Sequence, residues 1–160
     1  MRLTPYRRLL AAAAITSLVV VGCATDDASP GADGDGGAEA TVVAVSLQEW
    51  SVVPARSSAP AGDVTFAVTN DGPEDIHEFV VLKTDLDPAD LPVDENGVVS
   101  EEGEGIEVID EIEDISVGDS QDLTVALDPG SYILLCNIWS PDEEEAHYLL
   151  GMRVAFTVDE

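Results

Sequence analysis

Short runs of alternating apolar and polar residues are the feature that most limits what this chain can fold into. In residues 62–70, Val64, Phe66 and Val68 occupy every second position. A period of two places such side chains on one face of an extended strand, and β-branched and aromatic residues favour that conformation. Runs of this kind predict strands at Thr41–Trp50, Gly62–Asn70, His77–Thr84, Gln121–Leu127, Ser131–Cys136 and Met152–Val158.

Turn-forming sequences separate these runs, and no segment shows a long helical stripe. The turns are expected at Asn70-Asp71-Gly72-Pro73, Val117-Gly118-Asp119 and Asp128-Pro129-Gly130. Ile106–Ile115 is compatible with a strand or an amphipathic helix, and we favour a strand because the segment is short and leads into a turn. One short helix is expected around Pro88–Leu91. Six to eight strands in about 120 residues predict an all-β fold, either an antiparallel sandwich or a Greek-key barrel.

The first 22 residues are typical of an export signal. Met1–Arg8 is positively charged, and the apolar run Leu9–Val21 has 13 residues. This run is shorter than the roughly 20 residues that span a bilayer, and it has the length of a signal-peptide core. A buried core helix is the weaker alternative. We therefore assign residues 1–22 to a signal peptide and expect the protein to be exported.

The end of that signal carries a second motif. Val20-Val21-Gly22-Cys23 resembles the lipobox of prokaryotic lipoproteins, and the resemblance implies that Cys23 is lipidated. Two acyl chains suffice for stable anchoring. Residues 23–40 are small, flexible and acidic, which indicates a flexible linker. Residues 41–160 would then form one domain, tethered to the membrane through the lipid anchor only.

The acidic charge of the chain excludes two classes of partner. The chain has 33 acidic and 6 basic residues, a formal charge of −27. A nucleic-acid binder needs a basic surface, and so does a protein held to anionic lipid by Lys and Arg. Removal of residues 1–22 leaves 3 basic and 33 acidic residues, a formal charge of −30. Much of the acid is in Asp85–Asp114 and Asp142–Glu145.

The few residues that bind soft metals form a recognisable set. If Cys23 is lipidated, Cys136 is a lone thiol in an oxidising compartment, although a buried small apolar residue is the alternative reading. The chain has two His, His77 and His147, and one internal Met, Met152. Each alone is usually a solvated histidine or a core methionine. Together they are the ligand set of blue copper, two His and one Cys with a weak axial Met, whereas zinc more often takes four strong ligands.

Residues 44–160 resemble the cupredoxins, the small blue or type 1 copper proteins. The stretches that carry the resemblance are VSLQEWSVVP, AGDVTFAVTNDGPEDIHEFVVLKTD, LDPGSYILLCNI, HYLLGM and RVAFTV. It implies a cupredoxin-like Greek-key β-sandwich of about eight strands with one mononuclear copper. The implied copper ligands are His77, Cys136, His147 and Met152.

The resemblance also gives roles to residues beside the ligands. Asn70 and Gly72 match the turn before the first His, and Asn137 is a candidate for a hydrogen bond near the sulfur. One departure is the ligand loop, which is short in many relatives but has ten residues between Cys136 and His147 here. Trp139 in this loop is a candidate shield for the copper or a docking residue, with simple packing as the alternative.

These observations predict a copper protein that carries single electrons between Cu(I) and Cu(II). The alternatives are a copper-binding or delivery module with no role as an electron carrier, and a cupredoxin-like domain for partner binding. An enzyme is not expected, because copper oxidases need more His ligands than the two present, and no G-x-S-x-G motif occurs. The acidic surface predicts a redox partner with a basic docking face, and adaptation to high salt is the rival account of the same charge.

Overall fold

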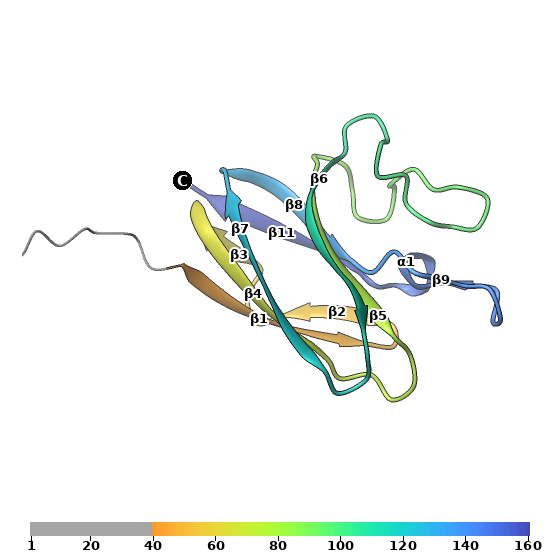
Figure 1. The fold of residues 1–160 in the computed structure, drawn as a ribbon. Coiled ribbons are helices and arrows are strands. Elements are labelled where there is room, and N and C mark those ends of the chain that lie inside the picture. Colours follow the sequence, from red (N-terminus) through yellow and green to blue (C-terminus); the bar gives the residue numbers. More distant parts are fainter. Residues whose placement is uncertain (1–39) are drawn as a thin grey trace, which may run out of the picture. The chain divides into compact units, whose positions relative to one another are not determined.

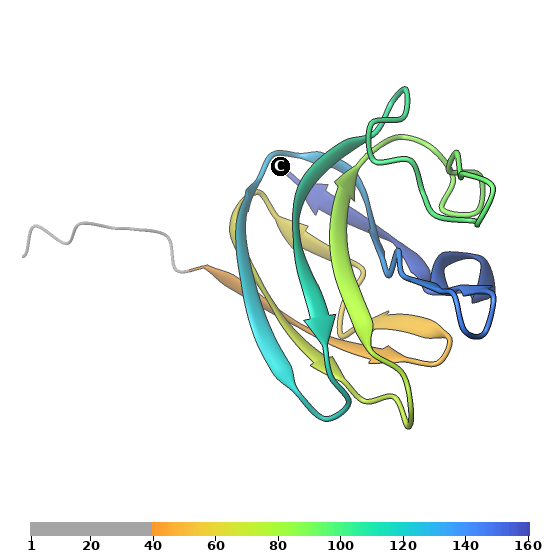
Figure 2. The same cartoon turned by 45° about the vertical axis from the view of Figure 1, so that its right-hand side comes forward.

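The computed structural model describes residues 40–160, and these form two facing β-sheets (Figures 1 and 2). The signal peptide, Cys23 and nearly all of the expected linker lie outside the described residues. Within residues 40–160, no helix is long and apolar enough to cross a membrane.

The first sheet has four strands and the second has five. In the first, the order is β2 (Ser51–Pro54), β1 (Thr41–Gln48), β4 (Gly62–Asn70) and β7 (Ser120–Leu127). In the second, the order is β3 (Ser58–Pro60), β11 (Arg153–Asp159), β8 (Gly130–Leu135), β5 (His77–Lys83) and β6 (Glu107–Ile115). The remaining elements are a small pair of strands, β9 (Trp139–Ser140) and β10 (Glu145–Ala146), and the single-turn helix α1 (His147–Leu150).

The alternating residues form the core between the sheets, as the sequence pattern predicts. Val64, Phe66 and Val68 of β4 are fully buried, and β4 pairs with β7 so that Phe66 lies opposite Leu123. The Phe66 ring packs against Phe79 of the facing sheet at a centroid distance of 5.3 Å. The predicted all-β sandwich is therefore confirmed.

Two strand pairs are parallel, so the sheets are mixed and not wholly antiparallel. β1 pairs in parallel with β4, and β3 pairs in parallel with β11. The chain leaves β1 through β2 and crosses to the second sheet at β3 before it returns as β4. This crossing lets β4 run in the same direction as β1. The two short strands β2 and β3 carry the crossing, and they were not predicted because each is too short to show alternation.

The segment between β5 and β6 covers the outer face of the five-stranded sheet and lies beside α1 (Figures 1 and 2). It buries a second apolar cluster made of Val80, Leu82, Leu91, Val99, Ile133, Leu135 and Tyr148. Because both faces of β5 and β8 are buried, their sequences read as continuous apolar runs without alternation.

The prediction of a short helix around Pro88–Leu91 is wrong, whereas the prediction of a strand in Ile106–Ile115 is confirmed by β6. At the first position the chain makes a turn in which the Asp87 carboxylate accepts a hydrogen bond from the Ala89 N–H. The turn does not continue as a helix because the following Leu91 precedes Pro92, and a proline disfavours helical conformation in the residue before it.

Candidate metal centre

Three strand ends bring the four predicted ligands to one end of the sandwich. His77 is the first residue of β5, Cys136 directly follows β8, and these strands are neighbours in the sheet. His147 begins α1, and Met152 precedes β11, which pairs with the other edge of β8. All four are buried, with at most 1% of any of them exposed.

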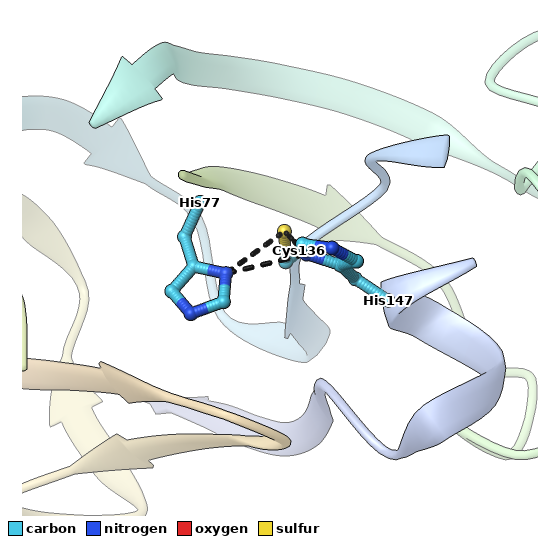
Figure 3. A group of neighbouring side chains, drawn as sticks. All are labelled: His77, Cys136 and His147. Carbon is cyan, nitrogen blue, oxygen red and sulfur yellow. Dashed lines mark hydrogen bonds between the residues drawn. The ribbon is translucent and has the colours of Figure 1, made fainter. Parts of the chain in front are cut away.

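Three donor atoms face one another at the centre (Figure 3). The Nδ1 atoms of His77 and His147 are 3.2 Å apart, and the Cys136 Sγ lies 4.0 Å and 3.4 Å from them respectively. A triangle with sides of 3.2, 3.4 and 4.0 Å has its equidistant point about 2.1 Å from each corner. Zinc bonds to imidazole nitrogen and thiolate sulfur are about 2.0–2.3 Å long. One transition-metal ion therefore fits between the three atoms.

The long ligand loop is closed by its own hairpin. β9 and β10 pair so that Trp139 lies opposite Ala146, and the His147 N–H donates to the Ile138 C=O at 3.0 Å. The ten-residue loop thus leaves the site after Cys136 and returns to it at His147. Its acidic tip projects away as an exposed turn, so the extra length does not separate the two ligands.

Met152 is tied to both neighbouring ligands through its backbone. Its N–H donates to the His147 C=O, and its C=O accepts from the Cys136 N–H, each at 3.0 Å. The single turn of α1 ends at Gly151, whose φ of 129° favours glycine. An added Cβ there would also lie 3.0 Å from the Trp50 carbonyl oxygen. Gly151 therefore sets the bend that carries the chain from His147 to Met152.

The hydrogen bond to the sulfur comes from a different residue than expected. The Glu78 N–H donates to the Cys136 Sγ at 3.3 Å. The Asn137 side chain instead pairs with both backbone groups of Val99, at 2.7 and 3.1 Å, and also donates to Glu101. Its role is to fasten the segment between β5 and β6 to the residue next to Cys136, and the expected contact near the sulfur is not made.

Asn70 and Gly72 act in the turn before His77, as the resemblance implies. The buried Asn70 amide donates to the carbonyls of Asp75 and Ile115, each at 2.8 Å, and accepts from the Gly72 N–H at 2.9 Å. These bonds join the end of β4 to the start of β5 and the end of β6. A Cβ at position 72 would lie 2.5 Å from a Glu49 carboxylate oxygen, so a larger residue there would displace that carboxylate.

Two residues of the β1–β2 turn border the site and were not predicted to do so. The Trp50 ring packs edge-on against the imidazole of His147 at 4.9 Å between centroids, and against His77 at 6.5 Å. The Glu49 carboxylate lies 3.8 Å from His77 Nε2. Trp139, a candidate shield or docking residue with simple packing as the alternative, lies in the β9–β10 hairpin. Among the described residues, the aromatic contacts to the two imidazoles come from Trp50 and not from Trp139. Glu49 and Trp50 lie in VSLQEWSVVP, one of the stretches that carry the resemblance. No spacing along the sequence relates them to the proposed metal ligands.

The protonation of the metal-free site follows from its burial. Burial lowers the pKa of His77, and the neighbouring His147 lowers it further, while burial is also the main cause that lowers the pKa of His147. Burial raises the pKa of the Cys136 thiol to about 12. At neutral pH the metal-free site holds two neutral imidazoles and a thiol.

The donor chemistry selects among metals. Thiolate and thioether are soft ligands that suit Cu(I), and imidazole binds both copper oxidation states. A second group of acidic residues, Glu78, Glu101 and Glu111, lies beside the site, but these are hard oxygen ligands that suit magnesium, calcium or manganese. The buried set of two imidazoles, one thiol and one thioether fits one mononuclear copper ion.

Comparison with solved structures finds proteins of similar fold, whereas comparison with family models and curated proteins finds no match. No protein-family model matches the chain, and no curated protein matches it. Dithionite-reduced auracyanin from the photosynthetic bacterium Roseiflexus castenholzii is 22% identical, with 76% of this chain and 98% of that chain covered and a TM-score of 0.52. Auracyanin B is also 22% identical, with 76% and 90% covered and a TM-score of 0.51.

A third similar structure is auracyanin A from Chloroflexus aurantiacus, which is described as a "blue" copper protein. It is 18% identical, with 75% of this chain and 99% of that chain covered and a TM-score of 0.50. At this level of identity the likeness concerns the fold, which is that of the cupredoxins.

Proposed function

We propose that this chain, which has the cupredoxin fold, holds one copper ion in a type 1 site and carries single electrons without turning over a substrate. The observation that carries the proposal is the buried triangle of His77 Nδ1, His147 Nδ1 and Cys136 Sγ, with no side longer than 4.0 Å. Met152 would be the weak axial ligand, as its buried position between the backbones of His147 and Cys136 supports.

A copper ion held there would supply a one-electron couple between Cu(I) and Cu(II). The protein contributes burial and a fixed geometry. The ligand side chains are buried between two sheets, and the hydrogen bonds of Asn70, Asn137 and Met152 connect the loops around them. Such packing keeps the donor positions similar in both oxidation states, so little rearrangement accompanies electron transfer.

Burial of the site favours an electron carrier over a copper-delivery module. Delivery requires ligands that an incoming partner can reach and displace. His147 is 1% exposed, with the Trp50 ring against its edge, and the β9–β10 hairpin closes the ligand loop. The lengthened ligand loop does not open the site, so it gives no support to the delivery alternative.

A groove next to the site supports a partner with a basic docking face. It has a volume of about 410 Å³ and is lined by Glu74, Asp75, Ile76, Asp114, Ile138, Trp139, Ser140 and Pro141. Three carboxylates at an apolar surface complement a partner that presents Lys or Arg around an apolar centre. Ile76 and Ile138 are each one or two residues from a proposed copper ligand, which gives a short path for an electron. The rate of association should fall as the salt concentration rises.

We further propose that the protein is exported and held to the cell membrane by lipid on Cys23. The support is the Met1–Arg8 charge, the 13-residue apolar run and the lipobox-like motif. Residues 24–40 would let the domain reorient towards a membrane-bound or diffusing partner.

The spectrum of the purified protein with one equivalent of Cu(II) tests the copper assignment. A type 1 site gives an intense visible band from thiolate-to-copper charge transfer and a characteristic paramagnetic-resonance spectrum. We expect Cys136→Ala to lose the band and Cys23→Ser, the matched thiol control, to keep it. Copper that is bound without the band would overturn the type 1 assignment.

A further inference from the structure

Glu49 places a carboxylate beside a proposed copper ligand from the opposite sheet. Its side chain is 11% exposed, and its Oε1 lies 3.8 Å from the Nε2 of His77. Both the His77 Nε2 and the Glu49 Oε2 are buried without a hydrogen-bond partner. A buried polar atom without a partner is costly. The unpartnered His77 Nε2, with a carboxylate oxygen 3.8 Å away, therefore indicates an interaction that shortens in another state of the site.

The position of this carboxylate is fixed by the loop that leads to His77. The Glu49 Oε1 accepts hydrogen bonds from the backbone N–H groups of Asp75 at 2.8 Å and Glu74 at 3.3 Å. The missing side chain at Gly72 leaves the space that the carboxylate fills. The carboxylate is therefore held in place independently of its contact with His77.

The two nitrogens of His77 face different surroundings. Nδ1 points to Cys136 and His147, and Nε2 points away from them (Figure 3). Nε2 is the atom that lies 3.8 Å from the Glu49 carboxylate. A histidine that binds a metal usually donates its other ring N–H to a carboxylate or carbonyl, which fixes the tautomer and the ring orientation. Within residues 40–160, no carboxylate oxygen lies within 4.0 Å of a His147 ring nitrogen, and Trp50 packs against that ring.

We propose that Glu49 is a positioning residue that holds His77 in the Nε2–H tautomer and lowers the reduction potential of the site. The claim about the reduction potential rests on the proposed function, whereas the claim about the tautomer does not. The N–H directed at the carboxylate leaves the Nδ1 lone pair free for the metal. The carboxylate charge, little screened at this depth, favours the more positive, oxidised form of the site.

The tautomer is tested on the metal-free protein by ¹⁵N nuclear magnetic resonance of the histidine rings. We expect the native protein to show His77 mainly as Nε2–H and Glu49→Leu to show a several-fold shift towards Nδ1–H. Glu74→Gln, a change at a neighbouring exposed residue, should match the native protein. Gly72→Ala, which displaces the carboxylate but keeps its charge, should shift the tautomer as Glu49→Leu does. This variant replaces Glu49→Leu in the test if Glu49→Leu does not fold.

The potential is tested with Glu49→Gln, whose amide oxygen can still accept from the loop N–H groups. We expect the reduction potential to rise, because the ratio of Cu(II) to Cu(I) affinity should fall by about tenfold, or about 59 mV for one electron. Glu74→Gln should shift it much less. Equal shifts in the two variants, together with an unchanged tautomer in Glu49→Leu, would overturn the proposal. If the native protein binds copper without a type 1 spectrum, the proposed function is overturned. The His77 tautomer in the metal-free protein still tests the positioning role of Glu49 in that case.

Discussion

Replacement of Asn70 by Ala should cost a large share of the stability of the protein. The Asn70 amide makes three hydrogen bonds, to the Asp75 carbonyl, the Ile115 carbonyl and the Gly72 N–H, at 2.8–2.9 Å. Each such bond contributes about 0.5–1.5 kcal/mol net, and a buried group left without a partner costs about 1–3 kcal/mol. Asn70 and Ile115 are fully buried, so water cannot easily replace the lost amide. We therefore expect a loss of about 2–4 kcal/mol in the free energy of unfolding.

Urea denaturation followed by fluorescence measures this loss. With a dependence of about 2 kcal/mol per molar urea, the midpoint should fall by about 1–2 M. Asn70→Asp should be at least as damaging, because a carboxylate oxygen would face two carbonyl oxygens. The control is Asn96→Ala, at an exposed residue of the segment between β5 and β6 whose side chain makes no hydrogen bond. A loss in Asn70→Ala no larger than in Asn96→Ala would refute the reasoning that this amide joins three elements.

Three further predictions concern the core, the acidic group beside the site and copper uptake. Phe66→Ala should cost about 3–5 kcal/mol in urea denaturation, since the ring is fully buried between Phe79 and the rest of the core; Val42→Ala, at an exposed position of β1, should change stability little. Burial and neighbouring carboxylates raise the pKa of Glu78 to about 7, so its stabilising contribution is present below pH 4.5 and is lost as the pH rises through 7. Glu78→Gln should therefore stabilise the protein at pH 8 and not at pH 4, and an equal gain at both would contradict the assignment. Because the Cys136 thiol has a pKa of about 12 and must lose its proton to bind copper, copper affinity should rise about tenfold per pH unit between pH 7 and 9, as equilibrium titrations at three pH values would measure.

Strands with one buried face could be predicted from the sequence with nearly the observed bounds. Gly62–Asn70 was expected and observed with the same bounds, because one of its faces is buried and the other meets solvent. β6 was ambiguous, since its acidic residues occur on both faces. The strands β2 and β3 and the pair β9–β10 were missed because two to four residues do not establish a period.

The proposed ligand set could be recognised in the sequence because His, Cys and Met each occur only twice in the chain. His77, Cys136 and His147 meet as expected, and a chain with two His and two Cys leaves few other choices. The residues around them could not be predicted. Glu49 and Trp50 reach the site only because the sandwich places the β1–β2 turn against the start of β5. That contact depends on the packing of two sheets, and no local sequence pattern encodes it.

The acidic strand β6 has a consequence for aggregation. It is the outermost strand of the five-stranded sheet, and an outermost strand presents free backbone groups that can pair with a second molecule. Its sequence, EVIDEIEDI, has a carboxylate at five of its nine positions. Like charges would be brought face to face if two such edges paired, so the strand is protected while its carboxylates are ionised. The five acidic residues of β6 should therefore oppose pairing between the sheets of two molecules at neutral pH, and self-association through this edge should increase in mild acid.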